Sequence, residues 1–306
     1  MQSPGFDVKL YFSGSVDHTV SEHMLAHNVH RLFTFAYPKE VFEYLDRADQ
    51  LGIRCNIMMD SGAFTAWSAG KPVTLPELIA YNDKVLATYG ARHNFVFIAL
   101  DVIPGERGRF ATQSEIAAAV EQSKANFVVL QEHYKGQTIM PVYHSGEHVS
   151  LRNWYMDRTD YICLSMDQGM SENNRLEWAK RVAVDGYRYH GLAATGNKMA
   201  TQIGWYSIDS SSWVTVGSMG SILWPVGEQF RVLAVSENSP ARHTAGQHIK
   251  TLTPIETELV RAYIVRLGFD PDTLATEYRE RWRWNIHQWV NAPWRTRVQK
   301  PMDLFS

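Results

Sequence analysis

Residues 95–143, FVFIALDVIPGERGRFATQSEIAAAVEQSKANFVVLQEHYKGQTIMPVY, contain two short apolar runs on either side of a long helical pattern. The runs at 95–100 and 138–143 are rich in β-branched and aromatic residues, which predicts strands. The segment 114–133 between them predicts a helix. A strand, a helix and a second strand in this order are typical of parallel strands joined by a crossover helix.

The same alternation runs through the first two thirds of the chain. We expect strands at 8–12, 30–36, 53–59, 95–100, 138–143, 161–166, 187–191 and 205–208. Eight strands with intervening helices predict an α/β fold of the (β/α)8 TIM-barrel type. A doubly wound open sheet is the alternative, but no G-x-G-x-x-G follows a strand and no Walker A sequence occurs, so its nucleotide-binding versions lose support.

The pattern changes after residue 210. Residues 221–236, SILWPVGEQFRVLAVS, predict a hairpin, and 253–268 and 272–290 predict two helices. We therefore expect a barrel catalytic core over residues 1–215. Residues 216–306 would form a short C-terminal extension, a hairpin and helices packed on the barrel within one structural domain.

Composition limits the class of protein. The 306 residues include 30 basic and 32 acidic side chains, and 45% are hydrophobic, which excludes disordered and collagen-like chains. No apolar run approaches the roughly 18 residues of a membrane span, and the N-terminus lacks the pattern of a signal peptide. Cys55 and Cys163 are too few for a disulfide framework or a cysteine-rich zinc site. These features predict a cytoplasmic protein with no membrane partner.

Candidate functional residues follow the predicted strands, because barrel active sites lie at the carboxyl ends of the strands. Asp60, Asp101 and Asp209 each come directly after such a run. A single aspartate there often only caps a helix or a turn. Three of them favour either glycosyl-transfer chemistry or binding of a divalent metal ion.

The metal alternative would use His144, His190 and Asp209, because imidazole and carboxylate groups are ligands of first-row metals. The set resembles part of a barrel amidohydrolase site. However, the first strand, KLYFSGS, lacks the paired histidines of those enzymes. We therefore expect no metal and keep metal-dependent hydrolysis as an alternative.

The glycosyl-transfer alternative fits the neighbouring residues better. Phe64 could stack on a base, Asp101 could accept from the N–H and amine of a guanine-like edge, and His144 could donate to the opposite carbonyl. Glycines in these loops would allow a flat ligand to approach closely. The expected substrate-binding residues are Ser61, Gly62, Phe64, Asp101, His144, Gly146, Ser165 and Gly191.

Four motifs carry a resemblance to a known family. Asp60-Ser61-Gly62-Ala63-Phe64, Ala99-Leu100-Asp101, His144-Ser145-Gly146 and Ser207-Ile208-Asp209-Ser210 together resemble the guanine transglycosylases, over roughly residues 50–215. These (β/α)8 enzymes exchange guanine in tRNA for a 7-deazaguanine base, as in queuosine and archaeosine formation. The pattern is most similar to the branch encoded by phages and genomic-island modification systems, which acts on DNA.

The resemblance implies a double displacement without a cofactor, in which Asp209 is the nucleophile and Asp60 the general acid/base. It implies DNA and a free 7-cyano-7-deazaguanine-like base as partners, with tRNA as the alternative polymer. Two departures bear on that choice. No cysteine follows Cys163 to rebuild the zinc site of the tRNA enzymes, so no zinc subdomain is expected, and Ser210 follows Asp209 where those enzymes have cysteine. A third departure concerns base binding, because His144 stands where the tRNA enzymes have glutamine.

Basic and aromatic residues indicate where a nucleic acid could bind. Residues 278–297, YRERWRWNIHQWVNAPWRTR, interleave arginine and tryptophan, which suits phosphate contact and base stacking. Alternatively, the tryptophans pack this helix and the arginines coat its outer face. The expected contacts are Arg107, Arg109, Lys198, Arg281 and Arg283. A catalytically dead barrel that only binds nucleic acid is the third hypothesis, and the presence of both Asp60 and Asp209 argues against it.

Overall fold

The computed structural model describes residues 8–14, 17–105, 109, 111–166, 169–184 and 186–292. The chain divides into two compact units. Among the described residues, the first unit comprises residues 8–13 and 29–209, and the second comprises residues 14–28 and 210–292, with the gaps just given. None of the helices in these described ranges has the length and apolar character needed to cross a membrane.

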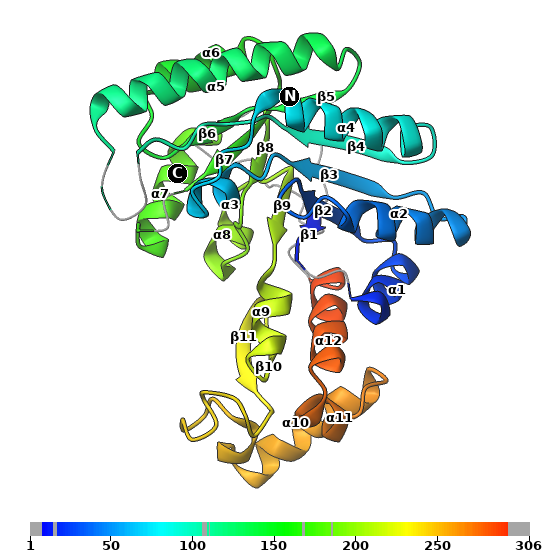
Figure 1. The fold of residues 1–306 in the computed structure, drawn as a ribbon. Helices are drawn as coiled ribbons and strands as arrows, with labels where there is room; N and C mark the ends of the chain where they lie inside the picture. The colour runs from blue at the N-terminus through cyan, green and yellow to red at the C-terminus, as the bar shows by residue number, and fades with distance from the viewer. Residues whose placement is uncertain are drawn as a thin grey trace. The chain divides into compact units, whose positions relative to one another are not determined.

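The first unit is a (β/α)8-type barrel, as the alternating pattern predicted. Its parallel sheet has the strand order β5-β4-β3-β2-β1-β9-β8-β7-β6 (Figure 1). The strands are β1 Lys9–Phe12, β2 His30–Thr34, β3 Asn56–Asp60, β4 Asn94–Ile98, β5 Thr138–Met140, β6 Val142–His144, β7 Tyr161–Ser165, β8 Arg188–Gly191 and β9 Ser207–Ser210.

The two edge strands of this sheet, β5 and β6, are separated in sequence only by Pro141. Proline has no backbone N–H to give to a ladder, so it interrupts the strand pairing. Its carbonyl oxygen still accepts from the Cys163 N–H at 2.9 Å. The two pieces are halves of the predicted strand at 138–143, so the sheet is nearly closed and the eight expected strands are confirmed.

Helices follow most of the strands. The barrel helices are α2 Glu40–Gln50, α3 Ala63–Ser68, α4 Leu75–Tyr89, α5 Gln113–His133, α6 Val149–Met156, α7 Glu172–Val182 and α8 Asn197–Gln202. In Figure 1, α4 and α5 run along the outside of the sheet. Both begin with capping boxes, Thr74 with Glu77 and Thr112 with Glu115, which satisfy backbone N–H groups at the helix start.

Apolar side chains fill the interior of the barrel, and polar side chains lie at the carboxyl ends of its strands. Apolar side chains such as Met58, Met140 and Cys163 form a fully buried cluster. Because all the strands are parallel, their carboxyl ends share one rim. The strand register aligns Thr34 with Asp60 and His144 with Ser165 at this rim.

The second unit is built on an antiparallel hairpin. Its elements are α1 His18–Ala26, α9 Ser212–Ser218, β10 Ser221–Val226, β11 Gln229–Ala234, the 3-10 helix η1 Ile249–Thr251, α10 Pro254–Arg266, α11 Pro271–Thr276 and α12 Tyr278–Val290. The expected hairpin is confirmed, with Ser221 paired to Ala234 and Val226 paired to Gln229. Trp284 of α12 is fully buried in the core of this unit.

One expected helix of this unit is two helices. The prediction of a single helix over 272–290 is wrong, because Glu277 has an extended backbone, with φ −104° and ψ 116°, between α11 and α12. The Arg281 guanidinium donates to the Leu274 carbonyl oxygen at 2.9 Å, near the end of α11. This contact satisfies a helix-terminal carbonyl that α11 cannot satisfy itself.

Candidate active site

Three carboxylates converge at the carboxyl end of the barrel strands. Asp60 ends β3, Asp101 follows β4, and Asp209 lies in β9. Burial raises the pKa of the Cys163 thiol in β7, and the negative charges of Asp60, Asp209 and Asp101 raise it further. All three carboxylates lie at or just after the carboxyl ends of parallel strands, which share one rim of the barrel.

The surroundings of Asp60 raise its pKa above that of an exposed aspartate. Burial raises its pKa to about 6, against a hydrogen bond from Thr34 that lowers it, and the charges of Asp101 and Asp209 raise it as well. The Gly62 N–H donates to Asp60 Oδ2 at 3.1 Å. A carboxyl group with a pKa near 6 can give and take a proton close to neutral pH.

Asp209 is held asymmetrically. Its Oδ1 accepts the Ala193 N–H at 2.9 Å and lies 3.4 Å from His190 Nε2. Its Oδ2 has a single long contact within the described ranges, 3.4 Å from the Ser13 hydroxyl. The side chain is 11% exposed, so one oxygen of a largely buried carboxylate is restrained while the other is only weakly engaged.

Asp101 belongs to a charged cluster with His144 and Glu147. His144 Nε2 lies 3.0 Å from Asp101 Oδ2, and His144 Nδ1 lies 3.3 Å from Glu147 Oε1. The backbone N–H of His144 also donates to Glu147 Oε2 at 2.6 Å. Burial lowers the pKa of His144, but the contacts with Asp101 and Glu147 outweigh burial and raise it to about 10. His144 is therefore a cation at neutral pH.

This cluster changes the role expected for His144. We expected its ring to donate to a base carbonyl, but both ring nitrogens already face carboxylates. A protonated ring with both N–H groups engaged has no donor left for a ligand. In the geometry described, His144 orients Asp101.

The glycines of the site are needed for two different reasons. Gly62 has φ +73°, and an added Cβ would lie 3.0 Å from the Ala36 backbone nitrogen. Gly191 has an ordinary backbone, but an added Cβ would lie 2.5 Å from the Ala194 Cβ, so the neighbouring residues would have to shift to admit it. Gly146 has φ +105° and open space around it, so its turn requires glycine for the backbone alone.

The other expected substrate-binding residues lie at the same strand ends. Phe64 in α3 is 61% exposed, with its ring centroid 6.0 Å from that of Trp67, so its face is available for stacking. Ser61 is buried, and its hydroxyl accepts the Ala63 N–H at the start of α3. Ser165 ends β7, where its carbonyl oxygen accepts the Ser145 N–H at 2.9 Å.

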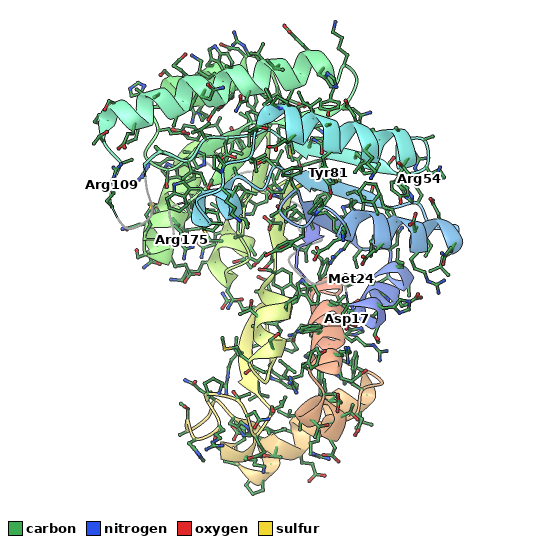
Figure 2. All side chains as sticks on the ribbon, viewed as in Figure 1. Asp17, Met24, Arg54, Tyr81, Arg109 and Arg175 are labelled. Atoms are coloured by element: carbon green, nitrogen blue, oxygen red, sulfur yellow. The ribbon has the colours of Figure 1, made fainter. Side chains whose placement is uncertain are left out.

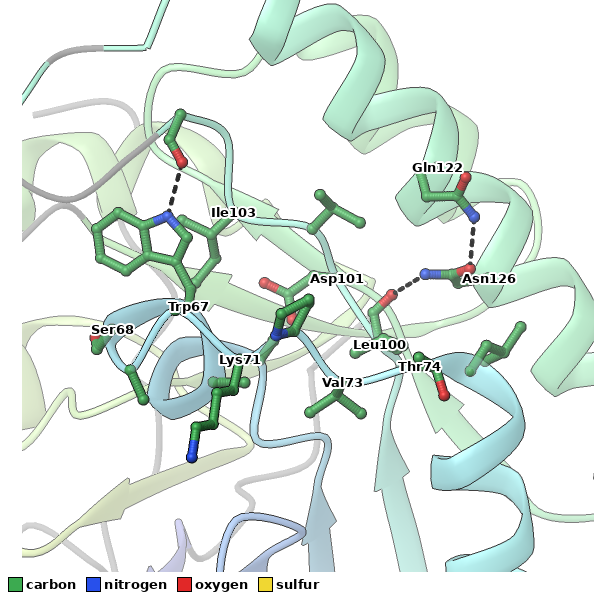
Figure 3. A pocket seen from close by; sticks show the side chains of 18 residues that line it. Trp67, Ser68, Lys71, Val73, Thr74, Leu100, Asp101, Ile103, Gln122 and Asn126 are labelled. Atoms are coloured by element: carbon green, nitrogen blue, oxygen red, sulfur yellow. Dashed lines mark hydrogen bonds between the residues drawn. The ribbon is translucent and has the colours of Figure 1, made fainter.

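A cavity of about 730 Å³ opens beside Asp101. Its walls come from the end of α3, the segment leading to α4 and the residues after β4. Figure 3 shows Trp67, Lys71 and Asp101 at this cavity, with the Trp67 ring N–H donating to the Gly105 carbonyl oxygen at 2.9 Å. The volume lies in the range of small-molecule sites and exceeds the needs of a single purine-sized base.

Arg281, one of the expected nucleic-acid contacts, is a structural residue. It is 5% exposed, and its guanidinium donates to the carbonyl oxygens of Gly217 and Leu274 at 2.7 and 2.9 Å. The expectation that it contacts phosphate is therefore wrong. Trp282 and Trp284 are buried as well, so packing explains much of the arginine and tryptophan pattern.

The remaining basic candidates are at the surface. Arg283 of the second unit pairs with Glu280 at 2.6 Å. In the barrel unit, Arg109 pairs with Glu115 at 2.5 Å and projects from the loop after β4 (Figure 2). Lys198 is exposed and donates to Asn173 at 3.0 Å. Arg107 lies outside the described residues, as do Arg295 and Arg297 of the arginine and tryptophan segment.

Two residues that sequence reasoning did not single out belong to the site. They are Glu147, which holds His144, and Ser13, which contacts Asp209. His190, named above only for the metal alternative, also contacts Asp209. Glu147 follows His144 by three residues, so an acidic side chain in the same loop was its only signal. The role of His190 depends on which face of β8 it occupies, and that requires the strand register.

No set of three or more histidine, cysteine, aspartate or glutamate side chains converges as a metal-binding cluster within the ranges that the structure describes. Comparison of the chain with protein-family models gives no match, and no curated protein matches it. The case for a function therefore depends on the residues and geometry of the site.

Proposed function

We propose that this protein is a guanine transglycosylase that exchanges guanine in DNA for a 7-deazaguanine base through a covalent aspartyl-glycosyl intermediate. The observation that carries the proposal is the pairing of two differently held carboxylates. The pKa of Asp60 is raised to about 6, so it can hold and release a proton near neutral pH, whereas Asp209 receives a backbone N–H on one oxygen and leaves the other weakly engaged. An acid and a nucleophile at the same end of the barrel strands are the minimum for double displacement at an anomeric carbon.

In the first half-reaction, Asp209 attacks C1′ of the target deoxynucleotide. A bond forms between the carboxylate oxygen and C1′, and the bond between C1′ and the guanine nitrogen breaks with its electron pair going to the base. Asp60 delivers its proton to the departing base, so neutral guanine leaves. The DNA strand remains attached to Asp209 as a glycosyl ester.

In the second half-reaction, a free 7-deazaguanine base enters the same pocket. The ionised Asp60 accepts the proton from the ring nitrogen that attacks C1′, and the ester bond to Asp209 breaks. The enzyme returns to its starting protonation state. The energy of the glycosidic bond is retained in the intermediate, so the exchange requires no cofactor.

Base selection is assigned to Asp101 and Phe64. His144 Nε2 lies 3.0 Å from Asp101 Oδ2 and holds this oxygen in place. A carboxylate only accepts hydrogen bonds, which suits the N–H and amine of guanine and 7-deazaguanine and does not suit adenine. The exposed Phe64 ring provides a face on which such a base can stack.

DNA is proposed over tRNA because of the sequence departures in the resemblance. The cysteine cluster of the tRNA enzymes has no counterpart after Cys163, and Ser210 follows the proposed nucleophile where they have cysteine. The two cysteines present are unpaired and buried, which suits the reducing cytoplasm where we place the protein. Lys198 and Arg109 are the proposed phosphate contacts of the barrel unit.

The test is base exchange with radiolabelled guanine. The purified protein is incubated separately with single-stranded DNA, with perfect and mismatched duplexes, and with tRNA, and polymer-bound label is counted. We expect label in DNA, with more in single-stranded and mismatched substrates because a stacked guanine must first be flipped out. Label in no polymer would refute the proposal, and label in tRNA alone would establish the tRNA alternative.

Two variants and a control make the test specific. Asp209→Asn removes the proposed nucleophile and should abolish exchange while leaving DNA binding intact. Asp60→Asn removes the proposed proton donor and acceptor and should abolish exchange as well. Asp157→Asn changes an exposed aspartate at the end of α6 and should exchange at the wild-type rate.

A further inference from the structure

A chain of buried polar groups leads from the interior of the barrel to Asp209. Tyr161 at the start of β7 hydrogen-bonds through its hydroxyl to the Ser207 hydroxyl. The Ser207 hydroxyl lies 2.6 Å from His190 Nδ1, and His190 Nε2 lies 3.4 Å from Asp209 Oδ1. His190 and Ser207 are completely buried.

The strand register explains this arrangement. Ser207 and Asp209 are two residues apart in β9, so their side chains lie on the same face of the strand. His190 of β8 is the register partner of Ser207. Its ring therefore has one nitrogen at Ser207 and extends the other toward Asp209. The Tyr11 ring meets it edge-on, with centroids 6.2 Å apart, which limits its rotation.

The partners of the two His190 ring nitrogens indicate which of these nitrogens carries a proton. An Nε2 without a proton would direct its lone pair at the oxygen of a carboxylate, which is repulsive. The favourable arrangement has a proton on Nε2 that faces Asp209 Oδ1, with the Ser207 hydroxyl able to donate to Nδ1 and the Tyr161 hydroxyl to Ser207. A separation of 3.4 Å is longer than a well-formed hydrogen bond, and Nε2 makes no closer polar contact among the described residues.

A second observation points to the same oxygen. Ala193 has φ +51°, a left-handed conformation that residues other than glycine rarely adopt. Its N–H is the group that donates to Asp209 Oδ1 at 2.9 Å. Strained backbone is concentrated at functional sites, where the strain holds a group in place.

We propose that His190 is a positioning residue which, together with the strained Ala193 N–H, holds Oδ1 of Asp209 and leaves Oδ2 as the atom that attacks C1′. This inference rests on the proposed transglycosylase function. The bonds made and broken are those of the first half-reaction, with Oδ2 as the new partner of C1′. His190 does not touch the substrate and acts only through Asp209.

The first experiment does not depend on base-exchange activity. In protein labelled with 15N-histidine, the His190 signals are assigned by their loss in His190→Gln, and their chemical shifts show which ring nitrogen carries a proton. We expect a protonated Nε2. A bare Nε2 would overturn the proposal whether or not the protein exchanges bases.

The second experiment separates positioning from binding. For His190→Gln we expect the kcat of base exchange to fall about 10- to 100-fold, with the KM values for DNA and for the free base unchanged. Ser207→Ala, which removes the contact to Nδ1, should lower kcat in the same direction. A KM that rises while kcat stays constant would overturn the role.

The control is His93→Gln. His93 is also a buried histidine that bridges a backbone N–H, that of Cys55, and a carboxylate, that of Asp49. It precedes β4, at the opposite end of that strand from Asp101. Loss of kcat in both variants would mean a general effect of removing a buried imidazole and would overturn the assignment. A wild-type protein without exchange, but with a protonated Nε2, would instead refute the proposed function and leave the geometry of His190 intact.

Discussion

Replacing Asp60 by asparagine should stabilise the barrel unit at neutral pH. Burial, with the charges of Asp101 and Asp209, raises the pKa of Asp60 from 3.8 to about 6. The folded protein therefore binds this proton more tightly than the unfolded chain does, and ionising Asp60 in the folded state costs free energy. Asparagine has nearly the same shape and no charge, and its carbonyl oxygen can still accept the Gly62 N–H.

The size and the pH range of this effect follow from the change in pKa. At about 1.4 kcal/mol for each pKa unit, a rise from 3.8 to about 6 corresponds to about 3 kcal/mol. Because the pKa is higher in the folded state, the wild type loses this stability as the pH rises from about 4 to about 6. The penalty is complete above that range and absent below it, and Asp60→Asn avoids it at every pH.

The assay is urea unfolding of the wild type and Asp60→Asn at a series of pH values between about 4 and 8, followed by circular dichroism. The difference in the free energy of unfolding should grow from near zero at the acid end to about 3 kcal/mol in favour of the variant at pH 8. The exposed-site variant Asp157→Asn should show a difference that does not change with pH. A difference in the free energy of unfolding that does not change with pH, or a destabilised Asp60→Asn at pH 8, would refute a pKa of about 6 for Asp60.

Three other substitutions test the packing and the base pocket. Gly191→Ala should destabilise the barrel by about 1–3 kcal/mol in urea unfolding, because the added Cβ overlaps Ala194; an unchanged midpoint would show that the backbone adjusts freely. Arg281→Ala should cost about 2–4 kcal/mol by leaving buried carbonyl oxygens without donors, whereas Arg283→Ala should stay within about 0.5 kcal/mol, and equal effects would contradict the burial difference. Asp101→Ala should weaken guanine binding by about 1–3 kcal/mol in competition assays against adenine, and unchanged discrimination would remove Asp101 from the base pocket.

The barrel was predictable because buried parallel strands appear in the sequence as continuous apolar runs. Each expected strand lies within a few residues of an observed one, and the three aspartates follow because strand ends share a rim. The break at Glu277 was not predictable, since neither proline nor glycine marks it. Helix α1, which Asp17 caps, also had no periodic pattern strong enough to identify it.

The partners of the site residues required three-dimensional information. Asp209 could be identified by its position, but the approach of His190 depends on the register between β8 and β9. The contact of Glu147 with His144 depends on the turn that brings the two residues together. For Arg281, the sequence alone could not distinguish a phosphate contact from a buried helix-terminal contact, because the distinction depends on the fold of α11 beside it.

Trapping of the covalent intermediate tests the central claim most directly. The protein is mixed with a single-stranded oligodeoxynucleotide without free base, denatured and digested, and the modified peptide is located by mass spectrometry. We predict a DNA adduct on Asp209, absent from Asp209→Asn and reduced when free guanine is added before denaturation. An adduct on Asp60, or base exchange by Asp209→Asn at the wild-type rate, would contradict the assignment of Asp209 as the nucleophile.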